Sequence, residues 1–236
     1  MTTIGVYDSG VGGLTTLKLL QREFPSADFY YLADNKNMPF GTKDEHTLCE
    51  IFDRALAKLK AHSEIQVFAC NTASTLTADN SVIKLLPPVV EGDTLVLATP
   101  KTVNHLKAMA KFKNSSCKFA DTPELASLVE TYVTVSARKN CLNMRELLPY
   151  VASKLFEFKG VKNVVLGCSH YLYLKNEISS VLGTVNFVDG NSRIVETLKK
   201  QIEPSHHQGK IVFDFTADDE STKYEKIYFL VQRDLI

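Results

Sequence analysis

The chain has 236 residues, of which 44% are hydrophobic and 23% are charged, a composition typical of a globular protein rather than a membrane, collagen-like or disordered one. Lysine plus arginine and aspartate plus glutamate both count 27, so the formal net charge is zero and no overall field favours nucleic acid or anionic lipid. We therefore expect a small molecule as the partner.

The N-terminal sequence carries no recognisable export signal. Residues 1–30 lack a basic region followed by a long apolar one, and no apolar stretch reaches the roughly eighteen residues of a membrane span. The five cysteines are odd in number and widely spaced, which favours free thiols over a disulfide framework. These features predict a cytoplasmic protein without a membrane partner.

Short apolar runs typical of strands recur along the chain, separated by longer stretches with helical spacing. They cover residues 4–7, 29–32, 65–69, 95–98, 164–166, 185–188, 211–213 and 228–231. Continuous apolar strands joined by helical crossovers predict an α/β fold with parallel sheets that are covered on both faces. Such sheets bind ligands beyond the carboxyl ends of their strands, so the polar residues that follow each run are candidate site residues.

Two pairs of runs resemble each other, namely residues 4–7 with 95–98 and residues 65–69 with 164–166. An internal duplication explains both and predicts two similar α/β units, related by a pseudo-two-fold axis, with their strand ends lining a shared cleft. Pro87-Pro88, interpreted as the end of a helix, and Gly92 mark the boundary between the units. With a return crossing near residues 204–209, residues 1–91 plus about 208–236 form the first predicted domain and residues 92–207 the second.

The first run leads into the glycine-rich segment Asp8-Ser9-Gly10-Val11-Gly12-Gly13. A glycine-rich turn after a strand can hold phosphate at a helix N-terminus, but this spacing matches neither the dinucleotide fingerprint nor a P-loop. The glycines can instead let the backbone approach a small ligand while Asp8 faces a thiol. An aspartate at a strand end can equally cap a helix, and the residues alone leave both readings open.

Two further segments carry weaker signals. Residues 38–43, which include Phe40 and Gly41, read as a tight loop whose amides could hold a carboxylate, although Pro-x-Gly is also a plain turn. Glu130 falls within a predicted helix, where a glutamate ordinarily faces solvent.

Two cysteines occupy matching places, because Cys70 and Cys168 each end an apolar run and precede small polar residues. A thiol titrates close enough to neutral pH to exchange a proton, so an opposed pair could move a proton across a bound molecule, as racemisation requires. Either cysteine alone could be a packing residue, and we expect Cys49, Cys117 and Cys141 to be packing or surface residues.

His170 lies two positions after Cys168, so in an extended segment both side chains leave on the same side and can meet. A histidine satisfied by the backbone is the plainer alternative. A Cys-x-His pair could also begin a zinc site, but no second closely spaced pair completes four ligands, so we expect no metal.

Four motifs together resemble the cofactor-independent aspartate/glutamate racemase family. They are Asp8-Ser9-Gly10-Val11-Gly12-Gly13, Pro39-Phe40-Gly41-Thr42-Lys43, Ala69-Cys70-Asn71-Thr72 and Gly167-Cys168-Ser169-His170. The resemblance implies a glutamate racemase that needs no cofactor, has its active site between two α/β domains, supplies D-glutamate for peptidoglycan and is commonly a homodimer.

The resemblance also implies roles for individual residues. Cys70 acts on D-glutamate with the help of Asp8, and Cys168 acts on L-glutamate with the help of His170 and Glu130. The implied substrate-binding residues are Asp8, Ser9, Phe40, Gly41, Asn71, Thr72, Ser169 and His170.

The chain departs from the family pattern at several points. Phe40 replaces a tyrosine, Lys101 stands where a small residue is usual, and the helix normally found between Val89 and Asp93 is missing. A lysine so close to the thiols can alter their pKa values. Two alternatives therefore stay open, namely a racemase for another amino acid such as aspartate, and a family member that binds a ligand or regulates without turnover.

Overall fold

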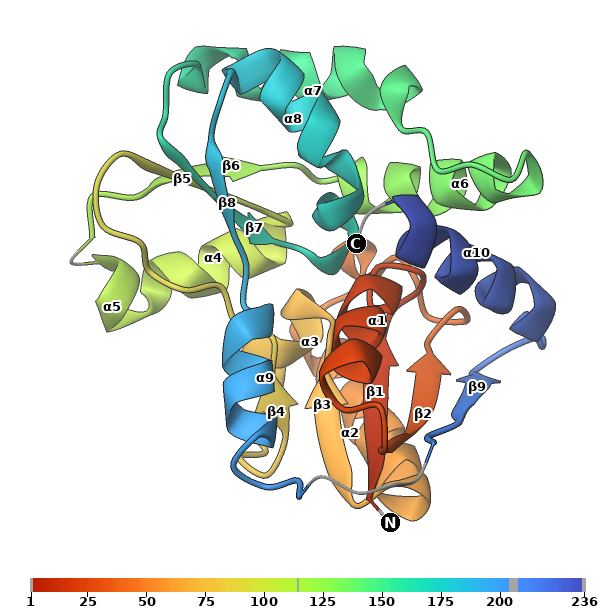
Figure 1. The fold of residues 1–236 in the computed structure, drawn as a ribbon. Coiled ribbons are helices and arrows are strands. Elements are labelled where there is room, and N and C mark those ends of the chain that lie inside the picture. The colour runs from red at the N-terminus through yellow and green to blue at the C-terminus, as the bar shows by residue number, and fades with distance from the viewer. Residues whose placement is uncertain (1, 114, 204–207, 235–236) are drawn as a thin grey trace.

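Two parallel sheets organise the protein in a computed structural model that describes residues 2–113, 115–203 and 208–234. The strands are β1 (Thr3–Asp8), β2 (Asp28–Ala33), β3 (Ile65–Phe68), β4 (Ile83–Lys84), β5 (Thr94–Ala98), β6 (Lys118–Asp121), β7 (Asn163–Gly167), β8 (Asn186–Val188) and β9 (Ile211–Phe215). Figure 1 shows a lower lobe built on β1–β4 and β9 and an upper lobe built on β5–β8.

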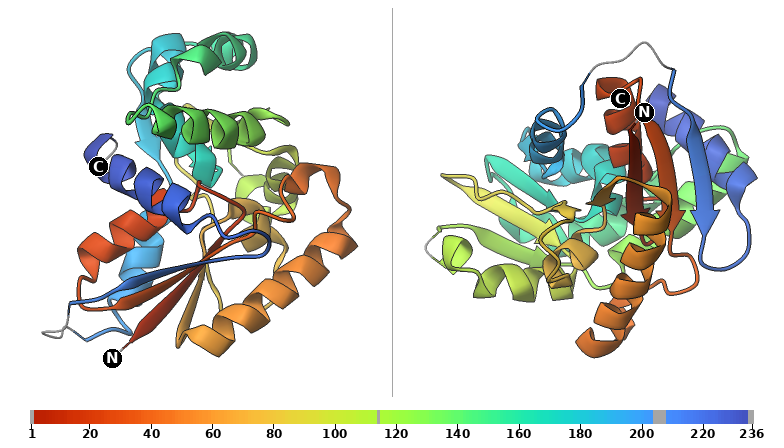
Figure 2. Two further views of the ribbon diagram at one scale, coloured as in Figure 1. Left: turned by 90° about the vertical axis from the view of Figure 1, so that its right-hand side faces the viewer. Right: turned by 90° about the horizontal axis from the view of Figure 1, so that it is seen from below.

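Helices cover the faces of both sheets, as the views in Figure 2 show. The α-helices are α1 (Leu14–Glu23), α2 (Glu45–His62), α3 (Asn71–Leu76), α4 (Pro100–Ala108), α5 (Ala110–Lys113), α6 (Leu125–Arg138), α7 (Leu148–Leu155), α8 (Lys175–Leu182), α9 (Asn191–Leu198) and α10 (Ser221–Asp234). Short 3₁₀ helices are η1 (Phe40–Thr42), η2 (Arg145–Leu147), η3 (Phe156–Phe158) and η4 (Ser169–Leu174). None of the helices described here combines the length and hydrophobicity that crossing a membrane requires.

The two sheets have the same strand order. The first runs β4-β3-β1-β2-β9 and the second β6-β5-β7-β8, with parallel pairing throughout. When β1–β4 are matched in chain order with β5–β8, each strand has the same neighbours in both sheets, apart from β9, which extends the first sheet beyond β2. This confirms the predicted fold class and explains why residues 4–7 resemble 95–98 and residues 65–69 resemble 164–166.

Alternating side chains of β1 bind the first sheet to the helices on its two faces. Ile4 and Val6 belong to the apolar cluster that includes α1 and α10, whereas Tyr7 packs in the cluster formed with α2. The first of these clusters continues into the second lobe through β5, α6 and α8, so a continuous core joins the two lobes. Because both faces of β1, β2, β3, β5 and β7 are covered, these strands read as nearly uninterrupted apolar runs.

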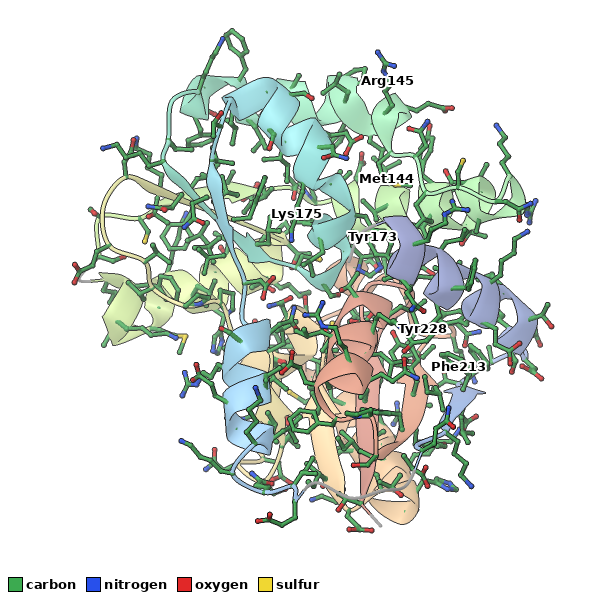
Figure 3. The ribbon with its side chains drawn as sticks, viewed as in Figure 1. Met144, Arg145, Tyr173, Lys175, Phe213 and Tyr228 are labelled. Carbon is green, nitrogen blue, oxygen red and sulfur yellow. The ribbon has the colours of Figure 1, made fainter. Side chains whose placement is uncertain are left out.

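The prediction of a strand at residues 228–231 is wrong, because these residues lie inside α10. Within α10, the side chain of Phe229 is 63% exposed. The buried side chains of this helix recur at helical spacing and are those of Tyr224, Ile227, Leu230 and Val231. Tyr228 projects from α10 toward Phe213 of β9, with ring centroids 6.1 Å apart (Figure 3). A four-residue apolar run fits either structure, and only the wider spacing distinguishes them.

The segment between the two lobes also differs from expectation. The element directly before Pro87-Pro88 is the short strand β4 and not a helix. Residues 85–93 contain no helix either. Gly92 has a φ of 91°, in the left-handed region that glycine adopts without strain. Residues 204–207 of the expected return crossing lie outside the described residues. The domain boundaries stay a prediction, and α9 packs on α1 and β4 of the first lobe.

A buried hydrogen bond ties α9 to α1. The Thr16 hydroxyl donates to Asn191 Oδ1 over 2.8 Å, and both residues are buried. Replacing Asn191 by alanine leaves the hydroxyl without its acceptor, so we expect the free energy of unfolding to fall by about 1–3 kcal/mol. Urea unfolding monitored by circular dichroism measures this. The neighbouring Ser192→Ala change at an exposed position is the control, and an equal loss in both variants contradicts the prediction.

Candidate active site

Four strand ends from the two lobes meet around one cavity of about 370 Å³. The chain leaves β1 at Asp8, β3 just before Cys70, β5 just before Thr99, and β7 just before Cys168. Of the predicted site residues, those lining this cavity are Ser9, Phe40, Gly41, Cys70, Asn71, Thr72, Cys168, Ser169 and His170. Asp8 and Glu130 lie behind this lining and contact it through hydrogen bonds.

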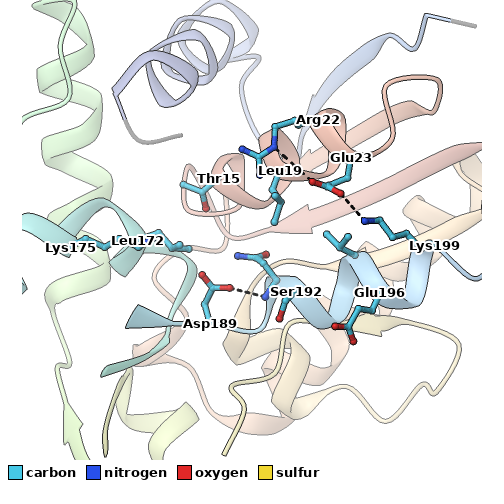
Figure 4. Close-up of a pocket in the computed structure, with 12 residues that line it drawn as sticks. Thr15, Leu19, Arg22, Glu23, Leu172, Lys175, Asp189, Ser192, Glu196 and Lys199 are labelled. Carbon is cyan, nitrogen blue, oxygen red and sulfur yellow. Dashed lines mark hydrogen bonds and ion pairs between the residues drawn. The ribbon is translucent and has the colours of Figure 1, made fainter. Parts of the chain in front are cut away.

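A larger cavity of about 640 Å³ lies between α1, α9 and η4 (Figure 4). None of the described residues that line it carries a thiol. Several of its charged groups are already engaged, since Glu23 pairs with both Arg22 and Lys199, and Asp189 accepts a hydrogen bond from the amide of Asn191. We therefore place the candidate active site in the smaller cavity that contains the cysteines.

The two thiols come from different lobes and line the same cavity. Cys70 is 5% exposed and Cys168 is 7% exposed, and each has extended backbone at the point where a strand gives way to a helix. Burial, and then the charge of Asp8, raises the pKa of Cys70, with a further contribution from Cys168, while the amides of Ala73 and Thr72 act in the opposite direction. The environment of Cys70 thus favours the neutral thiol.

Asp8 is fully buried and joins the lobes. Its Oδ1 accepts from the amide of Gly10 over 2.9 Å, and its Oδ2 accepts from the hydroxyl of Ser169, also over 2.9 Å. Burial raises the pKa of Asp8, opposed by His170 and by these two hydrogen bonds. The helix α1 begins after Gly13 without a side-chain cap, so Asp8 does not cap this helix, and its role toward a thiol stays a prediction.

His170 lies between Cys168 and Glu130. Its Nδ1 is 4.0 Å from the sulfur of Cys168, and its Nε2 is 2.9 Å from Glu130 Oε2. Burial by itself lowers the pKa of His170, but the hydrogen bonds and charges of Cys168 and Glu130 outweigh it and raise that pKa well above 6.5. Both ring nitrogens of the imidazolium can therefore donate.

The contact between Cys168 and His170 arises differently from the expectation. The sequence predicts that this segment is extended. In the structure Ser169–Leu174 forms the 3₁₀ helix η4, and this turn places the imidazole of His170 beside the sulfur of Cys168. Glu130 projects from α6 and also accepts from the amide of Val11 over 2.8 Å, a contact between residues 119 apart in the chain. No local signal in the sequence distinguishes Glu130 from an ordinary solvent-facing glutamate.

The glycine-rich segment fits closely against this histidine. A Cβ atom added at Gly12 would lie 2.5 Å from His170 Nδ1 and 2.5 Å from the Ser169 hydroxyl. Real side chains do not approach so closely, so glycine is required for the backbone to pass here. This supports the predicted close approach of the segment to the site in place of a phosphate-binding role.

Asn71 lines the cavity and carries a buried acceptor without a partner in the described part of the chain. Its Nδ2 donates to the carbonyl of Leu85 over 3.0 Å, whereas its buried Oδ1 has no partner among the described residues. Next to it, the hydroxyl of Thr72 lies 3.2 Å from that of Thr99 and 3.3 Å from that of Thr102, which links α3 to α4 across the lobes. A buried acceptor without a donor is costly, and this oxygen has almost no exposed surface through which a ligand in the cavity could reach it.

Sequence reasoning missed one wall of the cavity. Pro123, Glu124, Ala126 and Ser127 line it after β6, an edge strand that the apolar pattern did not reveal. Lys101, noted only as a departure from the family pattern, lines it as well. Among the described residues, no group of three or more histidine, cysteine, aspartate or glutamate side chains is arranged to hold a metal ion.

No protein-family model matches the chain, but individual known proteins are similar to it along most of its length. The chain is 33% identical to the glutamate racemase of Clostridium novyi over 218 residues, covering 84% of the chain and 83% of that protein. It is 30% identical to the glutamate racemase of Persephonella marina over 248 residues, covering 97% and 93%.

Solved structures show the same architecture. The glutamate racemase of Thermus thermophilus in complex with β-chloro-D-alanine superposes with a TM-score of 0.80 at 25% identity, covering 96% of this chain and 93% of that one. The glutamate racemase of Aquifex pyrophilus gives a TM-score of 0.71 at 27% identity, covering 99% and 94%.

Proposed function

The chain belongs to the glutamate racemase family, and from this premise we propose that it is an isomerase that interconverts L- and D-glutamate, with Cys70 and Cys168 as the two bases. The observation that carries the proposal is that two buried thiols from separate lobes line one cavity. We also propose that the D-glutamate formed in the cytoplasm supplies peptidoglycan synthesis, on the ground of the family resemblance.

In the proposed reaction one thiolate removes the Cα proton of glutamate and leaves a carbanion. The thiol on the opposite face then gives its own proton to that carbon. Atoms and electrons balance, because one proton is taken and one returned and only the protonation states of the sulfurs exchange. The Cα–H bond is a very weak acid, so the thiolate must be desolvated and aimed at contact distance.

We propose that the two thiols begin each turnover in opposite protonation states, with the His170 imidazolium beside Cys168. Burial and the charge of Asp8 favour the neutral form of Cys70, and the raised pKa of His170 supplies a cation 4.0 Å from the sulfur of Cys168. Because the resemblance assigns the position of Cys168 to L-glutamate, the enzyme accepts the L-enantiomer when Cys168 is the ionised partner. One turnover then leaves the state that accepts the D-enantiomer.

The remaining polar groups are proposed to hold the substrate. Asn71 lines the cavity and is proposed to contact the substrate, as the family resemblance implies. The hydroxyls of Ser9 and Thr72 and the amides around Phe40 and Gly41 can donate to carboxylates, which is the arrangement that stabilises charge developing beside Cα, while the hydroxyl of Ser169 donates to Asp8.

The test is exchange at Cα. Each glutamate enantiomer is incubated with folded protein in D₂O, and deuterium incorporation is followed by NMR while inversion is followed by circular dichroism. Exchange with inversion is expected, and its absence rejects catalysis. Faster inversion of aspartate than of glutamate would favour the racemase for another amino acid, and tight binding without exchange would favour a binding protein.

The pKa of His170 predicts the pH dependence. The imidazolium is the form that supports the Cys168 thiolate, so kcat/KM should fall as pH rises through the raised pKa, well above 6.5. The same protonation stabilises the fold fully below the unfolded-state pKa of about 6.5, and this contribution is lost as pH rises through the folded-state pKa. In His170→Gln both effects should disappear; an unchanged pH profile and unfolding curve contradict the assignment.

A further inference from the structure

One lysine of the cavity lies where a positive charge is unfavourable. Lys101 is the second residue of α4, lines the thiol cavity and is partly buried. The first turn of a helix attracts anions and repels cations. Among the described residues, no carboxylate lies within 4.0 Å of the Lys101 amine. An anion bound next to Lys101 would therefore be stabilised by the charge of this lysine.

The cavity has a buried floor and an outer part. Cys70, Cys168 and Asn71 are at most 7% exposed, whereas Lys101 and Gly41 are more exposed. The reacting carbon has to lie at the floor, because it must touch both sulfurs. The end of the substrate that reaches outward to Lys101 is thus the end farthest from Cα.

We propose that Lys101 binds the side-chain carboxylate of the substrate and selects an acidic amino acid over its neutral amide. The inference rests on the proposed function. Besides His170, the other charged residue lining the cavity is the exposed Glu124, whose negative charge cannot serve a carboxylate. Lys101 is consequently the cation available to the far end of a dicarboxylate among the residues that line this cavity.

The experiment uses Lys101→Met, Lys101→Arg and the control Lys107→Met, which removes an exposed lysine from the same helix outside the cavity. We expect Lys101→Met to lower kcat/KM for glutamate about tenfold, mainly through KM, because an ion pair to the side chain is equally strong in the ground and transition states. The preference for glutamate over glutamine should fall by a similar factor. Lys101→Arg should keep most of the preference for glutamate over glutamine, and Lys107→Met should keep all of this preference.

A second measurement separates this inference from the proposed function. Glutarate has two carboxylates but no α-ammonium group and cannot be racemised, so its binding by calorimetry is independent of turnover. Glutarate binding that weakens about tenfold in Lys101→Met but not in Lys107→Met supports the inference even if the protein shows no exchange at Cα. Equal binding to wild type and Lys101→Met, or a loss confined to kcat, overturns it even if glutamate is racemised.

Discussion

Replacing either Cys70 or Cys168 by serine is expected to lower the rate of glutamate racemisation about a thousandfold or more. A hydroxyl has nearly the same size as a thiol but does not ionise near neutral pH, so the variant loses one of its two proton-transfer groups, each of which typically contributes 10²–10⁴-fold. Both positions are buried against the cavity, and the small change in volume leaves the packing intact. Circular dichroism of each pure enantiomer measures the loss.

The control is Cys49→Ser, a partly buried cysteine on α2 outside the cavity, which should keep near-normal turnover. The two active-site variants should also separate exchange from inversion. In Cys70→Ser, Cys168 can still remove the Cα proton of L-glutamate and return deuterium to the same face. This variant should therefore retain deuterium exchange into L-glutamate while it loses inversion to D-glutamate. Near-normal inversion in either variant eliminates the two-base scheme.

The loss must be equal in both directions when it is expressed as kcat/KM. Enantiomers have the same free energy in water, so the equilibrium constant is one and no substitution can change kcat/KM for one direction alone. Asymmetry between Cys70 and Cys168 therefore has to be sought in exchange at Cα and in kcat and KM taken separately. An apparent one-way racemase among the variants would indicate an assay error.

The parts of the site that could be predicted follow from one rule of parallel sheets. Cys70 and Cys168 end apolar runs, and because strand ends of a parallel sheet carry the ligand site, their shared cavity could be anticipated from the pattern of runs. The repeated order of strands likewise follows from a duplication visible in the sequence. By contrast, β4 and β6 are short edge strands with little apolar content, and no periodic pattern marks them.

Contacts between the lobes could not be predicted from the residues themselves. The hydrogen bond from Ser169 to Asp8 joins residues 161 apart, and that from Val11 to Glu130 joins residues 119 apart. Local spacing shows which face of a helix Glu130 occupies but not which loop packs against that face. Only the resemblance to a family brought Glu130 into the predicted site.

Replacing Gly12 by alanine should lower kcat about a hundredfold while the protein still folds. The added methyl would meet His170 Nδ1 and the Ser169 hydroxyl at 2.5 Å, and neither can move freely, because His170 is bonded to Glu130 and Ser169 to Asp8. A shift of the imidazole relative to Cys168 misplaces the cation that supports the thiolate, and displacements of about 1 Å can cost a factor of 10². Initial rates of racemisation at a series of L-glutamate concentrations give kcat and KM separately.

Gly41→Ala is the matched control, because a Cβ there meets no atom within 4 Å and Gly41, like Gly12, does not need a positive φ. Gly41 lines the cavity, so any effect of its methyl should appear in KM through contact with substrate, whereas the Gly12→Ala effect should appear in kcat. The contrast arises because one methyl displaces a positioned histidine and the other only occupies space. If Gly12→Ala turns over normally, the close contact of the glycine-rich segment with His170 is not what aligns that side chain with Cys168.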